Sequence, residues 1–127
     1  MSAEIWRNTK QLFELDPRPA VEQLIYEVRA AEFERWQAAE HVLWTTAEGD
    51  RFPAFLGKET WLQDLGEWYR VSIVIYWRTL EDWLGIDPVW LEAQEAAFAQ
   101  AVGAGNYRLV QAGHDTGAHY FKISEYR

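Results

Sequence analysis

Two hydrophobic periods alternate along the chain, one of two residues that is typical of strands and one of about 3.6 residues that is typical of amphipathic helices. The shorter period predicts strands over residues 21–28, 55–62, 68–77, 107–112 and 119–126. The longer period and its end signals predict helices over residues 30–47 and 88–102, with a short helical turn over 79–84. Strands interleaved with two long helices are typical of a mixed α+β domain.

Capping residues mark the ends of the two later helical elements. Asp87 followed by Pro88 is a strong helix start, because the aspartate accepts from free N–H groups and proline fits the first turn. Gly103 follows the last helical position and is expected to adopt the left-handed conformation that ends a helix. Thr79 is expected to cap the short turn in the same way as Asp87 caps the long helix.

Residues 1–19 are predicted to form an N-terminal arm, and residues 20–127 a single domain. The apolar residues of the arm recur with a seven-residue spacing, which places them on one side of a short helix: Ile5, Trp6, Leu12 and Phe13. Pro17 and Pro19 then end that helix. We expect the arm to pack on its own domain or on a second copy; the alternatives are partial disorder and a membrane or foreign-partner role. No basic segment precedes an apolar run here, so we expect no secretory signal.

The order of elements in the domain is strand–helix–strand–strand–helix–strand, followed by one more C-terminal strand. This is the split βαβ, or ferredoxin-like, order. Right-handed crossovers would place both helices on one face of an antiparallel sheet. The predicted fold class is therefore α+β, with two helices on one sheet face and an extra strand at the end.

The strand over residues 68–77 predicts how the two faces of the sheet are used. One face is apolar and should meet the helices: Tyr69, Val71, Ile73 and Ile75. The other face is mixed: Arg70, Ser72, Val74 and Tyr76. Neighbouring strands add apolar candidates to this mixed face: Ile25, Trp61 or Leu62, and Tyr107 or Leu109. A mixed face can meet water alone, but the added apolar area would require cover, so we expect a homodimer that packs these sheet faces together.

The order of elements resembles the dimeric α+β barrel superfamily, with FLGKETW at residues 55–61 and YRLVQAGHDTGAHYFKISEYR closing the chain. More narrowly, residues 20–126 are similar to an uncharacterised family of small cyanobacterial proteins within that superfamily. The superfamily includes antibiotic-biosynthesis-type monooxygenases, haem-degrading enzymes, chlorite dismutases and stress-induced dimers. The resemblance therefore implies a dimeric barrel and does not assign a reaction.

Composition narrows the function classes. The 127 residues carry a net charge of −8, which disfavours binding to phosphate backbones. The chain has no cysteine, which excludes disulfides, thiolate nucleophiles and cysteine-based metal sites and fits a cytoplasmic protein. No apolar run is long enough for a membrane-spanning helix. Eight Trp, six Tyr and six Phe indicate either a heavily aromatic core or an aromatic surface that a partner or ligand covers.

Glu40 is the most informative single residue, because it lies inside the apolar stripe of the first helix. A carboxylate there must find a partner or take up a proton. In a catalytic interpretation Glu40 is a general base beside an apolar pocket. In a structural interpretation it pairs with a cation such as Lys58 or Arg70.

Histidines offer two weaker hypotheses. His41 follows Glu40 on the helix, and haem-degrading members of the superfamily use a helix histidine as the iron ligand, but no further motif surrounds it. A half-exposed helix histidine is the alternative. His114 and His119 flank Asp115 in the closing turn, which matches the ligand types of a metal triad at loose spacing. We expect neither a metal nor a cofactor.

Aromatic residues could line a cleft between sheet and helices for a flat organic molecule: Tyr26, Trp44, Trp61, Tyr76 and Trp83. Core packing is the alternative role of these rings. The candidate catalytic residues are Glu40 and Tyr76, and the candidate ligand-binding residues follow them: Tyr26, His41, Trp44 and Arg70. The leading hypothesis is a homodimer that binds a small apolar or aromatic molecule. The alternatives are a cofactor-independent monooxygenase or isomerase, and a purely structural dimer.

Overall fold

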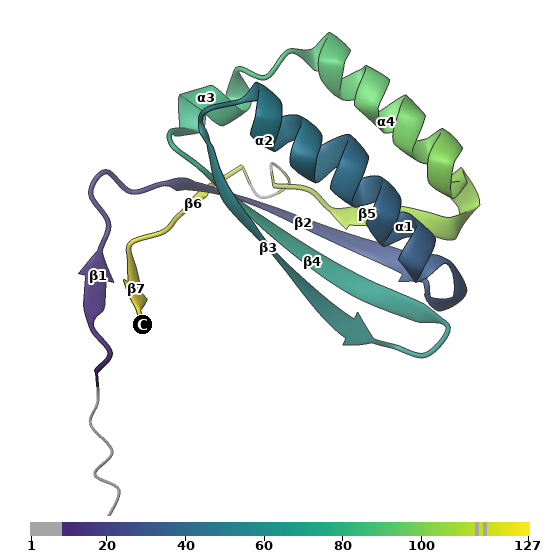
Figure 1. The fold of residues 1–127 in the computed structure, drawn as a ribbon, viewed down its shortest axis with the longest axis horizontal. Helices are drawn as coiled ribbons and strands as arrows, with labels where there is room; N and C mark the ends of the chain where they lie inside the picture. The colour runs from purple at the N-terminus through teal and green to yellow at the C-terminus, as the bar shows by residue number, and fades with distance from the viewer. Residues whose placement is uncertain (1–8, 114, 116) are drawn as a thin grey trace, which may run out of the picture.

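A computed structural model describes residues 9–113, 115 and 117–127 of the chain. Its main sheet is antiparallel and contains β2 (Ala20–Arg29), β3 (Phe55–Asp64), β4 (Trp68–Trp77) and β5 (Tyr107–Gln111) in the order β3-β4-β2-β5 (Figure 1). The short β6 (Tyr120–Phe121) extends the sheet beside the start of β2. All four long strands of the domain fall within two residues of their predicted ends.

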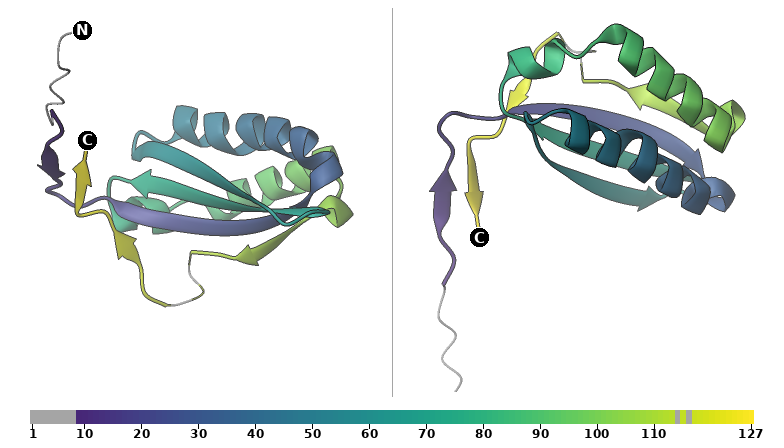
Figure 2. Two further views of the ribbon diagram at one scale, coloured as in Figure 1. Left: turned by 90° about the horizontal axis from the view of Figure 1, so that it is seen from below. Right: turned by 45° about the horizontal axis from the view of Figure 1, so that its top comes forward.

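Two helical segments lie side by side and cover one face of this sheet (Figure 2). The first follows the short 3-10 turn Ala30–Glu32 and consists of α1 (Phe33–Glu40), a π-helical segment (His41–Thr46) and α2 (Ala47–Arg51). The second is α4 (Pro88–Val102), preceded by the short α3 (Leu80–Leu84) and followed by a 3-10 turn, Ala104–Asn106. The antiparallel sheet with both long helical elements on one face is compatible with a ferredoxin-like α+β fold.

The predicted helix ends are confirmed at the atomic level. Thr79 Oγ1 accepts from the backbone N–H of Asp82 at 3.0 Å, and Asp87 Oδ1 accepts from that of Val89 at 3.0 Å. Gly103 has a φ of 91°, which a side chain would strain, and a Cβ there would lie only 2.8 Å from Asn106 Nδ2. These local signals set the start of α3 and both ends of α4.

The apolar face of β4 meets the helices, as predicted. Val71, Ile73 and Ile75 are each no more than 3% exposed. Their antiparallel partners on β2 share this face because directly opposed residues point the same way: Tyr26, Leu24 and Glu22. A cluster of edge-to-face rings continues the core under the helices, with Trp36 packed on Tyr26 at 5.6 Å and on Phe98 at 6.1 Å between ring centroids.

The N-terminal arm is a strand where its sequence predicted a helix. β1 (Leu12–Glu14) pairs antiparallel with β7 (Ser124–Tyr126) in a separate two-stranded sheet, so the helix prediction is wrong at Leu12 and Phe13. Reciprocal backbone hydrogen bonds between Gln11 and Arg127, at 2.9 and 3.0 Å, extend the pairing. Pairing with the C-terminus satisfies the backbone of a segment too short for a stable helix. Ile5 and Trp6 lie outside the described residues.

The final predicted strand is likewise divided. Its first half, β6, joins the main sheet, whereas β7 leaves the domain with β1, and the two form an arm that projects from the body (Figures 1 and 2). We define this β1–β7 pair as the arm sheet. Among the described residues, no helix is long and apolar enough to cross a membrane.

Candidate functional site

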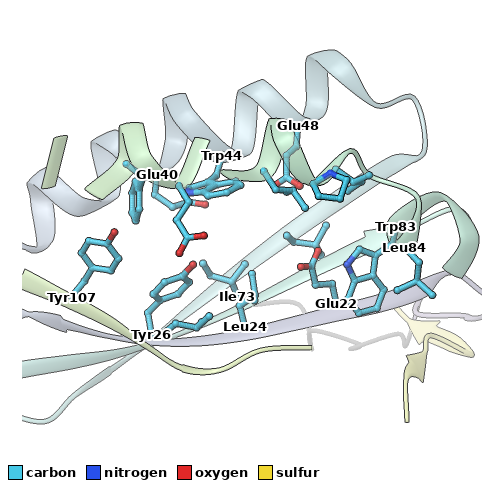
Figure 3. Close-up of a pocket in the computed structure, with 17 residues that line it drawn as sticks. Glu22, Leu24, Tyr26, Glu40, Trp44, Glu48, Ile73, Trp83, Leu84 and Tyr107 are labelled. Atoms are coloured by element: carbon cyan, nitrogen blue, oxygen red, sulfur yellow. The ribbon is translucent and has the colours of Figure 1, made fainter. Parts of the chain in front are cut away.

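A cavity of about 410 Å³ lies between the sheet and the helices (Figure 3). Its sheet wall includes Leu24 and Ile73, and its helix wall includes Leu91 and Phe98 of α4. The cavity reaches the surface, because its lining includes the exposed Glu95 of α4 and exposed residues of the adjoining elements, Leu84 and Leu109. A concave, mainly apolar space of this size is typical of small-molecule sites.

Glu40 enters this cavity from the end of α1 and is paired with Lys58 of β3. Thr45 Oγ1 lies 3.1 Å from both carboxylate oxygens of Glu40, and the Lys58 ammonium also donates to that hydroxyl. The two charged side chains are only 11% and 8% exposed. Burial lowers the pKa of Lys58 to about 8, and the charge of Glu22 acts in the opposite direction. The predicted structural pairing of Glu40 with Lys58 is confirmed.

Glu22 is a second carboxylate of the cavity, on the central strand β2. Its Oε1 accepts from the indole Nε1 of Trp77 at 3.0 Å. Burial raises the pKa of Glu22 to about 6, while hydrogen bonds from Trp77 and Trp83 and the charge of Lys58 oppose that rise. Lys58 and Glu22 stand in one row across the sheet with Ile75 between them, so about two strand spacings separate their backbones.

Glu48 is the third carboxylate, and it lines the cavity from α2 while only 6% exposed. Within the described part of the chain, no cation or hydrogen-bond donor pairs with its side chain. Burial raises the pKa of Glu48 to about 8, and repulsion from Glu22 contributes to the rise. Glu48 is therefore mostly protonated at neutral pH, and its carboxyl group has no described partner.

The π-helical segment explains how Glu40, Trp44 and Glu48 all reach the cavity. A π turn adds one residue to the helix and shifts the following side chains around its axis. Polar contacts support its carbonyl groups: the Thr46 hydroxyl lies 3.0 Å from the carbonyl oxygens of both His41 and Val42. Trp44 Nε1 is buried without a hydrogen-bond partner among the described residues.

The predicted site residues fall into two groups. Glu40, Trp44 and Tyr26 line the cavity, and so does Trp83 from the wider set of aromatic candidates. Burial raises the pKa of the Tyr26 hydroxyl well above its usual range, so it stays protonated and is available to donate.

The remaining candidates lie elsewhere. Tyr76 and Arg70 are on the opposite face of the sheet, where the Tyr76 hydroxyl donates to Glu59 at 3.1 Å and Arg70 contacts Glu27 at 3.6 Å. His41 is exposed on the helix and does not line the cavity. Tyr76 and Arg70 therefore cannot act on a molecule held beside Glu40. We call this second face, which carries Arg70 and Tyr76, the open face.

Trp61 and the closing turn test two further hypotheses: that Trp61 lines the cleft, and that the turn holds a metal ion. Trp61 is 64% exposed on the open face, opposite Ser72, so it is not part of the cavity. Among the described residues, no group of three metal-ligating side chains is close enough to hold an ion, and His114 lies outside them. Asp115 Oδ2 instead accepts from the backbone N–H of Ala112 at 2.8 Å, as expected of a turn residue.

Glu22 and Glu48 are cavity residues that the sequence interpretation did not include. Glu22 is two residues before Leu24 and four before Tyr26, so the alternation of side chains along the strand is enough to place it on the face that meets the helices. Glu48 lies beside the stripe of a regular helix and enters it only through the π turn, for which the sequence carries no simple signal.

Comparisons with known proteins bring no further residues into the site. No family model, curated protein or solved structure matches the chain.

Proposed function

We propose that the protein binds a small apolar or aromatic organic molecule in the cavity between sheet and helices. The observation that carries the proposal is a space of about 410 Å³ with mainly apolar walls, in which the Trp44 indole nitrogen is buried without a partner among the described residues and the Glu48 carboxyl group, on a residue only 6% exposed, is bound by no described cation. Unsatisfied polar groups in an apolar enclosure cost free energy, which a ligand with complementary groups would recover. Apolar walls supply most of the contact area, and the polar groups fix orientation.

An oxygenase or isomerase in which Glu40 is the base has less support. The Glu40 carboxylate is bound by Lys58 and Thr45, so its oxygens are already engaged by donors. A general base needs a free lone pair within reach of the proton that it removes. Binding is therefore the function that the geometry supports best.

Filling the cavity tests this proposal. Leu91→Phe on α4 should reduce the affinity for a neutral aromatic probe such as 2-naphthylmethanol at least tenfold, because the larger ring occupies the ligand's space. Val89→Phe is the matched control, since Val89 lies on the same helix, is 72% exposed and does not line the cavity. Isothermal titration calorimetry measures both. Equal affinities in the wild type and Leu91→Phe would place the probe outside this cavity.

We also propose that a second copy of the chain covers the open face and the arm sheet. Large apolar side chains are exposed there, including Trp61 and Tyr120 on the main sheet and Leu12 and Tyr126 on the arm sheet. Exposed patches of this kind are typical of protein–protein contacts. A two-fold dimer would bury both surfaces at once, and it is the arrangement that the resemblance to dimeric α+β barrels implies.

Trp61→Ala should weaken this dimer roughly thirtyfold, because a tryptophan buried at an interface commonly contributes 2 kcal/mol or more. Sedimentation equilibrium over a concentration series measures the dissociation constant. Val89→Ala removes an exposed apolar side chain from the helical side and should leave the constant unchanged. A monomeric wild type at high micromolar concentration would contradict the proposed dimer.

A further inference from the structure

The charges in the cavity do not balance. Lys58 neutralises Glu40, to which its ammonium group is bound. Glu22 and Glu48 remain, and no cation among the described residues contacts either carboxyl group. Figure 3 shows the two side chains approaching each other from opposite walls, Glu22 from β2 and Glu48 from α2, at the Trp83 end of the cavity. Their mutual repulsion is one of the effects that keep Glu48 protonated.

Two buried acids that face each other across an apolar space are costly to ionise together. Either protons or a bound cation relieve this cost. When Glu48 keeps its proton and Glu22 is ionised, the buried part of the cavity carries one uncompensated negative charge, in addition to the exposed Glu95 in its lining. A ligand with a single positive charge would match it, whereas a carboxylate or phosphate would add a third negative group.

We propose that the ligand of this cavity is an apolar or aromatic molecule with one ammonium group, and that this group lies between the carboxyl groups of Glu22 and Glu48. This inference rests on the proposed binding function and specifies the class of ligand.

The surroundings fit an organic cation better than a metal ion. Metal sites need several ligands in close array, and no group of three is present in the described residues. The walls are instead apolar and aromatic, and Trp44 and Trp83 present indole rings that attract organic cations. Exposed Glu95 lines the mouth, and the net charge of −8 would draw cations toward it.

Three probes with one ring system separate the inference from the function on which it rests. We would titrate the wild-type protein at pH 7 with 2-naphthylmethylamine, 2-naphthylmethanol and 2-naphthoate, and measure heats of binding. The amine should bind at least tenfold more tightly than the alcohol, and the carboxylate should bind most weakly. If the alcohol binds as well as the amine, the cation inference fails and the binding function stands. If none of the three binds, the proposed function itself is overturned.

Substitution of the acids locates the ammonium group. Glu22→Gln removes the carboxylate that is ionised at pH 7 and should lower the affinity for the amine at least tenfold while changing that for the alcohol less than twofold. Glu48→Gln should act in the same direction but less strongly, because it removes only the charge that Glu48 acquires when the ammonium group is bound. Asp50→Asn, also on α2 but exposed, is the control and should change neither affinity. Binding of the alcohol shows that each variant is folded, and unchanged amine affinity in both glutamine variants would overturn the proposal.

Discussion

Replacement of Lys58 by methionine is expected to lower the free energy of unfolding at pH 7 by about 3–5 kcal/mol. The substitution keeps the apolar stem of the side chain and removes its ammonium group. Glu40 would then be a buried carboxylate without a cation, held only by the Thr45 hydroxyl at 3.1 Å. Urea unfolding followed by tryptophan fluorescence measures the loss, and the loss should shrink near pH 4, where an unpaired carboxylate can take up a proton.

The double variant Glu40→Leu/Lys58→Met distinguishes loss of pairing from loss of packing. Exchange of a whole buried ion pair for apolar residues of similar size is commonly neutral or stabilising, so the double variant should recover most of the wild-type stability. Arg78→Met provides a surface comparison: Arg78 pairs with Asp82 at 3.2 Å in an exposed position, so this substitution should cost far less stability than Lys58→Met. A double variant as unstable as Lys58→Met alone would show that the loss comes from altered packing around residue 58 and not from the unpaired charge of Glu40.

The fold of the domain was largely predictable because its signals are local. β4 alternates so regularly that its residues, its bounds and its buried face all follow from the sequence. The caps at Thr79 and Asp87 fixed the helix starts through a single side-chain geometry. By contrast, the arm sheet depends on contact between opposite ends of the chain. The spacing of apolar residues over positions 5–13 describes that segment alone and cannot predict pairing with a distant strand.

The site was predicted in part, and the errors have two distinct origins. Glu40 was recognised because a charged residue interrupts an apolar stripe. Tyr76 was predicted to line the cavity, although side chains alternate along β4 and Tyr76 points to the same face as Arg70, the open face. Glu48 could not be recognised from a regular helical period, because the π turn between His41 and Thr46 moves it into the stripe.

Glu48→Gln is expected to stabilise the protein by about 3–4 kcal/mol at pH 8 and to have almost no effect at pH 4.5. The carboxyl pKa is about 8 in the folded chain and 4.5 in the unfolded one, so the folded state holds a proton that the unfolded state releases. Below pH 4.5 both states hold the proton, so Glu48 costs the folded state almost no stability. As pH rises toward 8, the unfolded state releases the proton first and the free energy of unfolding falls. The raised pKa of Glu22 lowers the free energy of unfolding in the same way as pH rises to about 6. Lys58, whose pKa is about 8 in the folded chain, stays mostly charged in both states below that pH, so it adds no pH dependence over this range.

Urea unfolding of both proteins at pH 4.5, 6 and 8 measures this difference, and parallel pH profiles would contradict it.

The same substitution is expected to reduce the preference for an ammonium ligand, because Glu22 keeps its charge, so stability at pH 8 should rise while affinity for the amine falls. Such opposite changes are expected where a binding group is kept at a cost to the folded state. A cation between Glu22 and Glu48 would stabilise their charged forms, so 2-naphthylmethylamine should raise the melting temperature of the wild type at pH 8 more than that of Glu48→Gln. Equal shifts would mean that the instability of Glu48 at high pH has no connection with the ligand.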